Sequence, residues 1–181
     1  MTSGCMPRGV KVAPLSKQSI KQKALIIRDK IFKLSLNQSI DLSRGLEHRL
    51  HELGVILEVW EIEDMPDVEA LTNPDAMTII LRADTYDALC DVSDPKHCRA
   101  RFTVAHEIGH LILHEGFALA RGAVRHKHYE DSEWQADTFS AELLMPSHMC
   151  RGLSLEEIQT KFVVSYSAAK NKFETLSKGG F

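Results

Sequence analysis

The sequence predicts an α+β fold that is mostly helical and has a small antiparallel sheet of about three strands. Apolar residues recur at steps of three and four along most of the chain, as on the buried face of a helix. Residues 55–63 (VILEVWEIE) instead alternate, and VEALT and MTIILRAD follow as two further strand candidates. With 181 residues, the chain has the length of one compact domain. We expect a flexible arm over residues 1–15 and a single domain over residues 16–178.

The first half of the domain is expected to contain two helices and the sheet. One apolar stripe at helical spacing predicts an amphipathic helix over residues 16–34; it comprises Ile20, Ala24, Ile27, Ile31 and Leu34. A second helix is expected to begin near Ser39 or Asp41. The turn signal NPD at residues 73–75 separates the second strand from the third.

The second half is expected to be helical. Asp94 followed by Pro95 is a good helix start and predicts a helix over about residues 95–115. After a loop, a helix over about residues 132–145 ends before Pro146. A capping box at SLEE opens the C-terminal helices, over about residues 154–177.

Composition and charge indicate a cytoplasmic protein. The chain is 44% hydrophobic and 26% charged, and no apolar run reaches the roughly 18 residues of a membrane span. Its start lacks the apolar stretch of a signal peptide, and its four cysteines form no CxxC pair. Residues 1–35 hold eight Lys or Arg against one acidic residue. We interpret this basic end as a solvated helix face, the alternative being a docking surface for nucleic acid or an acidic partner.

The strongest functional signal is the HExxH pattern within the apolar segment RFTVAHEIGHLILH (residues 101–114). His106 and His110 are one helical turn apart, so both imidazoles can point at one tetrahedral zinc ion. Glu107 can then reach a water in an open coordination position and act as general base. The alternative, buried histidines bonded to backbone, would require partners for three polar side chains in an apolar helix.

A catalytic zinc needs a third protein ligand, which EWQADTFSAELLMP (residues 133–146) can supply. Glu133 and Asp137 are also one turn apart. The economical assignment makes Glu133 the ligand and Asp137 the acceptor for the N–H of one zinc histidine, which fixes its tautomer. Glu142 is the main alternative ligand, although it lies about 180° round the helix from Glu133.

Other polar residues near these segments have less certain roles. His114 lies one further turn along the face of His110, where we expect a partly exposed residue at the helix end, with a place in the cleft as the alternative. One residue of the loop between the two helices could stabilise the oxyanion of a tetrahedral intermediate, although ordinary loop residues are the better interpretation for most of the candidates. The candidates are Arg121, His126, His128 and Tyr129.

Together the two segments resemble the ImmA/IrrE family of metallopeptidases. In the first, the resemblance is carried by Arg101, Phe102, Thr103, Ala105, His106, Glu107, Gly109 and His110. In the second, it is carried by Glu133, Ala136, Asp137, Phe139, Ala141, Leu143, Leu144, Met145 and Pro146. The tail LSLEEIQTKFVVSYSAAKNKF is similar to the family's helical ending. Gln135 stands where the family's second motif often has an acid, which favours Glu133 as the ligand there.

The resemblance implies a zincin-like, minimal gluzincin fold over residues 16–178, with zinc between the HExxH helix and the Glu133 helix. Some members of that family carry a fused DNA-binding domain, but 181 residues are too few for one beyond the metallopeptidase domain, so we expect the stand-alone form. The substrate or partner that it implies is a helix-turn-helix repressor or antitoxin encoded alongside, in mobile-element or stress regulation.

We therefore predict a zinc-dependent endopeptidase. Zinc would polarise the scissile carbonyl and a water, and Glu107 would take the water's proton and pass it to the leaving amine. An extended substrate is expected to pair with the edge of the strand Met77–Arg82. A basic stripe is a candidate for partner recognition and consists of Lys17, Lys21, Arg28 and Lys33.

Two alternative functions are consistent with the sequence. In the first, a zinc-binding toxin or regulatory protein acts by contact with its cognate partner, without proteolysis. In the second, a DNA-associated regulator uses the basic N-terminal helix and the C-terminal helices. The turn at Val164-Ser165 superficially resembles a helix-turn-helix, but plain packing helices are the better interpretation, so we expect no direct nucleic-acid binding.

Overall fold

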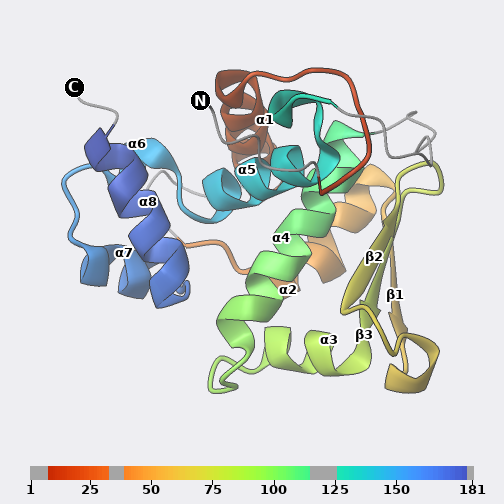
Figure 1. Ribbon diagram of the computed structural model, residues 1–181. Coiled ribbons are helices and arrows are strands. Elements are labelled where there is room, and N and C mark those ends of the chain that lie inside the picture. The colour runs from red at the N-terminus through yellow and green to blue at the C-terminus, as the bar shows by residue number, and fades with distance from the viewer. Residues whose placement is uncertain (1–7, 33–38, 115–125, 179–181) are drawn as a thin grey trace.

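The computed structural model describes residues 8–32, 39–114 and 126–178. Figure 1 shows a mostly helical molecule with one small sheet at its side. The α-helices are α1 (Lys17–Lys30), α2 (Leu42–Gly45), α3 (Ala83–Cys90), α4 (His97–Leu113), α5 (Ser132–Leu144), α6 (Ser147–Cys150), α7 (Leu155–Phe162) and α8 (Tyr166–Lys178). The strands are β1 (Ile56–Trp60), β2 (Ala70–Asn73) and β3 (Thr78–Arg82). This architecture confirms the α+β fold class.

α1 begins where the sequence predicts, because the hydroxyl of Ser16 caps it by accepting a hydrogen bond from the N–H of Ser19. Its apolar stripe packs on α5, and Ile20 and Ala24 are fully buried there. The buried Arg28 guanidinium donates a hydrogen bond of 2.8 Å to the carbonyl of Leu143. Arg28 therefore belongs to the core and is not part of a basic surface stripe, and Lys33 lies outside the described residues.

The second predicted helix is a continuous helical stretch with uneven winding. α2 is capped by Asp41, whose carboxylate accepts from the N–H of Arg44. A wider turn (η1, Leu46–Leu50) and a tighter one (η2, His51–Leu53) then follow. Gly54 ends the stretch in the left-handed region, at φ 77°, where glycine carries no side-chain penalty.

The sheet is mixed, so the prediction of an antiparallel sheet was wrong in one pairing. β2 and β3 form the expected antiparallel hairpin, but β1 pairs with β3 in parallel, giving the order β1-β3-β2. The strands still alternate in direction along the chain, and β3 is inserted between the other two. Burial explains this order: Ile79 and Leu81 of β3 are fully buried, whereas β1 is largely exposed and takes an edge.

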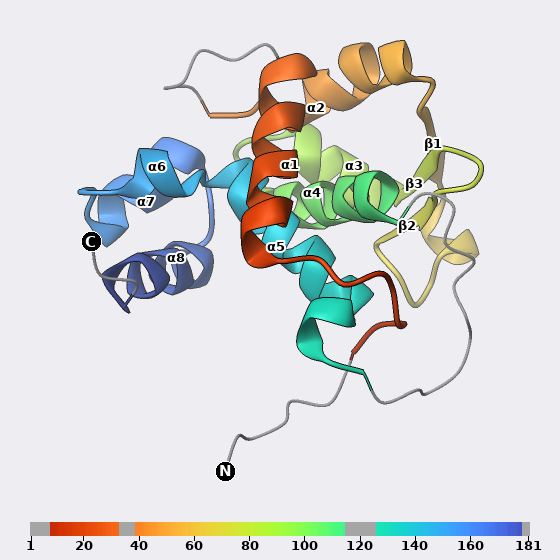
Figure 2. The ribbon, with the colours of Figure 1, turned by 90° about the horizontal axis from the view of Figure 1, so that it is seen from above.

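α4 and α5 cross at close range, and this contact builds the centre of the molecule (Figures 1 and 2). Gly109 makes it possible, because a Cβ at this position would lie 3.2 Å from the Cα of Ala136 and 3.2 Å from the ring of Phe139. At its other end, α4 is fixed to the chain around α7. The buried Arg101 donates hydrogen bonds to the carbonyls of Ile40, Phe162 and Val163.

Residues 8–15, which the sequence assigns to a flexible arm, run along the start of α5. The amides of Arg8 and Gly9 donate to the carboxylate of Asp131, at 2.9 and 3.1 Å. The amide of Val12 donates to the carbonyl of Glu130, at 2.8 Å. This part of the segment is therefore hydrogen-bonded to the domain, and residues 1–7 lie outside the described part of the chain.

The C-terminal helices pack on one another and cover the end of α5. The capping box predicted at Ser154 is present, with reciprocal hydrogen bonds between Ser154 and Glu157. Ile158, Phe162 and Ala169 are fully buried between α7, α8 and the core. In the described part of the chain, no helix is both long enough and apolar enough to span a bilayer.

Candidate metal centre

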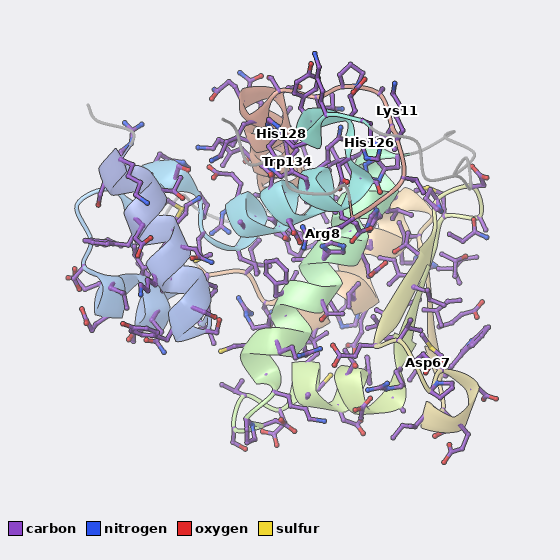
Figure 3. All side chains as sticks on the ribbon, viewed as in Figure 1. Arg8, Lys11, Asp67, His126, His128 and Trp134 are labelled. Carbon is purple, nitrogen blue, oxygen red and sulfur yellow. The ribbon has the colours of Figure 1, made fainter. Side chains whose placement is uncertain are left out.

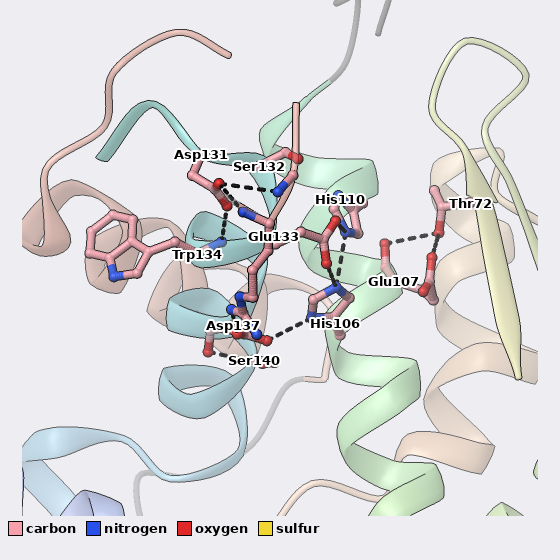
Figure 4. Close-up of polar contacts among 12 residues, drawn as sticks. Thr72, His106, Glu107, His110, Asp131, Ser132, Glu133, Trp134, Asp137 and Ser140 are labelled. Atoms are coloured by element: carbon pink, nitrogen blue, oxygen red, sulfur yellow. Dashed lines mark hydrogen bonds and ion pairs between the residues drawn. The ribbon is translucent and has the colours of Figure 1, made fainter. Parts of the chain in front are cut away.

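Three side chains from α4 and α5 converge at the crossing of the two helices (Figure 4). The Nε2 atoms of His106 and His110 are 2.9 Å apart. The carboxylate of Glu133 lies 3.2 Å from the first and 3.3 Å from the second. Ligand atoms on a tetrahedral zinc are separated by roughly 3.3 Å, given metal–ligand bonds of about 2.0–2.1 Å. The spacing of the three groups therefore suits one metal ion.

His106 is oriented by Asp137, one turn after Glu133 on α5. The Nδ1–H of His106 donates to the Asp137 carboxylate at 3.0 Å, since an ionised carboxylate only accepts hydrogen bonds. The guanidinium of Arg8 forms an ion pair with the same carboxylate, from the N-terminal segment. Burial alone would raise the pKa of Asp137, but hydrogen bonds from His106 and Arg8 lower it. Asp137 is thus held ionised as an acceptor for His106.

His110 is oriented by His114, which is held in turn by Gln135. The sequence did not reveal this role of His114. The amide nitrogen of Gln135 donates to the carbonyls of Ala13 and Tyr129, so its oxygen is left to accept from Nε2 of His114. His114 is 1% exposed, and burial followed by the nearby His110 lowers its pKa to about 4. This neutral ring accepts from the Nδ1–H of His110 at 3.0 Å. The expectation of a partly exposed His114 was therefore wrong.

The donor set fits a metal cation. With both Nδ1 atoms donating, the Nε2 lone pairs of His106 and His110 face one another and face the Glu133 carboxylate. Three electron-rich groups at this distance need a positive charge between them. In the metal-free protein a proton supplies it: burial disfavours charge on His106, but Asp137 and Glu133 raise its pKa to about 9.

Glu107 projects to the other side of α4, toward the sheet (Figure 4). Its carboxylate accepts a hydrogen bond of 2.5 Å from the hydroxyl of Thr72 on β2, which also contacts the Glu107 carbonyl at 3.2 Å. Thr72 is thus a further site residue that the sequence analysis missed. The two residues are 35 positions apart, and no local pattern links them.

The alternative third ligand, Glu142, lies away from the two histidines. It is buried, accepts from Lys172 at 2.7 Å and accepts from the amide and hydroxyl of Ser147. The structure thus brings Glu133, and not Glu142, to His106 and His110.

Two of the loop residues considered for the oxyanion, His126 and His128, lie near the start of α5 (Figure 3). The imidazole of His126 contacts the carboxylate of Asp131 at 3.1 Å. His128 packs its ring against Tyr129 and Trp134. Arg121 lies outside the described residues. Oxyanion stabilisation by any of these side chains stays a prediction.

An HExxH helix that packs closely on a carboxylate-bearing helix, beside a small sheet, is typical of a metallopeptidase domain. Residues 96–174 match the family model described as the IrrE N-terminal-like domain, of the peptidase M78 family. Over this part of the chain, which holds His106, Glu107, His110 and Glu133, the match supports the resemblance to the ImmA/IrrE family of metallopeptidases. No curated protein matches the chain in the corresponding comparison.

Proposed function

We propose that this protein is a zinc-dependent endopeptidase whose substrate is one specific partner protein. The observation that carries the proposal is the convergence of His106, His110 and Glu133, with Glu107 one residue from the first ligand. Two neutral imidazoles and one carboxylate are a ligand set that zinc accepts while keeping a coordination position open.

The residues of the site have separate tasks in the proposed reaction. His106, His110 and Glu133 would hold the zinc, which when bound supplies a Lewis acid for the scissile carbonyl and activates a water. Glu107 accepts the proton of the attacking water and delivers it to the leaving amine. Thr72 holds the carboxylate of Glu107 in place by donating a hydrogen bond from its hydroxyl group.

We assign the proposed substrate edge to β2, which corrects the expectation for Met77–Arg82. β3 pairs on both sides, with β1 and with β2, so it has no free edge for a substrate. β2 pairs with β3 alone among the described strands, and its Thr72 touches Glu107. An extended peptide that pairs with β2 would therefore lie beside the proposed general base.

The partner that we propose is a helix-turn-helix repressor or antitoxin encoded alongside, in the cytoplasm. The resemblance to the ImmA/IrrE family, which the family-model match supports, is the basis of this proposal. An endopeptidase that needs an extended segment would cut a linker or a transiently unfolded end of that partner.

The Glu107→Gln substitution tests the reaction, because it removes the proton acceptor and keeps the shape of the side chain. Co-expression of the neighbouring gene's product with the wild-type chain should yield a discrete fragment, whereas co-expression with Glu107→Gln should yield intact partner. Zinc analysis should give about one ion per chain for both. Equal loss of the partner with both versions would exclude the proposed mechanism. Zinc retention without any cleavage would favour the toxin or regulatory alternative, which acts by contact alone.

A further inference from the structure

A pocket of about 320 Å³ lies between α1, α5 and α8, next to the candidate metal centre. At its near end are Asp137 and Phe102, and both contact His106: Asp137 through a hydrogen bond, Phe102 through its ring. Asp137 holds the Nδ1 side of the His106 ring, and the metal would bind the Nε2 side. One imidazole ring therefore separates this pocket from the metal centre.

The lining of the pocket combines apolar and cationic side chains. The apolar side chains are Phe102, Trp134, Ala141, Met145 and Ala168. The cationic side chains are Lys17, Lys21 and Lys172. A group that fits this lining has an aliphatic stem and an anionic end.

The positive charge of the pocket is not fully matched by its two carboxylates. Glu142 is paired with Lys172 at 2.7 Å and lies 4.0 Å from Lys21. Asp137 is paired with Arg8, outside the lining of the pocket. Lys21 donates one hydrogen bond, of 2.8 Å, to the hydroxyl of Ser147.

Lys17 lies one turn before Lys21 on α1 and has no hydrogen bond or ion pair with any residue that the structure describes. The ammonium groups of these two lysines thus have N–H donors left for an incoming acceptor. Because Arg28 is buried, the basic surface of α1 does not extend as a stripe along the helix. Two neighbouring ammonium groups can bind a single acidic side chain, whereas nucleic-acid binding is marked by a basic patch or stripe.

We infer that this pocket is a specificity subsite that binds an aspartate or glutamate side chain of the peptide substrate, near the scissile bond. The inference rests on the proposed peptidase function and names a chemical feature of its substrate. The carboxylate would accept from Lys17 and Lys21, and its stem would pack on Trp134 and Met145.

Fluorescence-quenched decapeptides with Glu or Gln at each position in turn are the probe. With the zinc-loaded protein, one position should favour Glu over Gln by roughly tenfold in kcat/KM, as for one charge-assisted hydrogen bond. The same peptides are then titrated against the Glu107→Gln protein by fluorescence anisotropy. The Glu form should bind more tightly by a similar factor, and this second readout does not need catalysis.

Two variants and a matched control assign the preference to the pocket. Lys17→Gln should lower the Glu-to-Gln ratio, and Lys17→Gln combined with Lys21→Gln should bring it close to one. Lys23→Gln removes a charge from the same helix outside the pocket and should keep the preference. Thermal melting of each variant checks that the fold is intact, and Lys17→Gln alone leaves the hydrogen bond to Ser147 in place.

The outcomes separate the subsite from the peptidase function. Absence of a Glu preference in binding, or a preference that survives the double substitution, overturns the subsite. Cleavage without a Glu preference overturns the subsite and supports the peptidase. A lysine-dependent Glu preference in binding without cleavage of any peptide supports the subsite and counts against the peptidase.

Discussion

Replacing His114 by alanine should weaken metal binding although His114 is not a ligand. The substitution removes the acceptor for the Nδ1–H of His110, a contact of 3.0 Å, and leaves the Gln135 oxygen without its donor at 3.2 Å. His110 would lose the partner that fixes its tautomer and ring orientation. Loss of such a partner typically costs 10–100-fold in metal affinity, which corresponds to about 1.4–2.7 kcal/mol.

Competition with a chromophoric chelator at pH 7 measures this loss as a change in the zinc dissociation constant. Asp137→Asn is the matched comparison, because it weakens the equivalent support of His106, at 3.0 Å. Far-UV circular dichroism of both variants should match that of the wild type. A folded His114→Ala protein with unchanged zinc affinity would refute the argument that His114 orients His110.

Two further substitutions test the packing around the site and the orientation of the proposed general base, Glu107. Glu142→Gln should destabilise the fold by about 3 kcal/mol at pH 7 in chemical denaturation, since it leaves the buried ammonium of Lys172 without its charge partner. Burial alone would raise the pKa of Glu142, but Lys172 and Ser147 lower it below the ordinary 4.5. The greater unfolding free energy of the wild type is therefore present above pH 4.5 and should shrink as the pH falls through the lowered pKa of Glu142. A wild-type advantage that does not change between pH 7 and pH 3 would contradict this assignment. Thr72→Val should leave zinc binding unchanged and lower kcat by roughly tenfold, because the carboxylate of Glu107 loses its hydrogen-bond donor. A kcat equal to that of the wild type would show that Thr72 does not position Glu107.

The sequence predicted those features that depend on local spacing. Pairs at i and i+4 placed His106 with His110 and Glu133 with Asp137 on common helix faces, and the close α4–α5 contact at Gly109 then brings the faces together. The features that it missed depend on contacts between distant segments. β1 alternates in the same way whichever neighbour it pairs with, so its parallel pairing with β3 could not be inferred from its own residues.

The same limit explains the errors at single residues. Thr72 has no pattern around it, and its role depends on how the β2–β3 hairpin is placed against α4. His114 lies at a helix end, where exposure is common, and its helix position does not reveal the contact with Gln135 of α5 that holds it inside. Arg28 follows the spacing of a basic stripe but reaches the carbonyl of Leu143, because α1 packs on α5 at that point.

The N-terminal segment gives the candidate metal centre an extent that the family match alone does not indicate. The matched region begins at residue 96, yet Arg8 is paired with Asp137 and the backbone of Gly9 lies against Glu133. A Cβ at Gly9 would lie 2.8 Å from the backbone nitrogen of Glu133, so any larger residue there would push directly on the proposed ligand. A fragment trimmed to the matched boundaries would keep all three proposed ligands and lose the segment that lies over Glu133. For this protein, expression boundaries and fusion tags have to be chosen with the metal centre in view, starting upstream of Arg8.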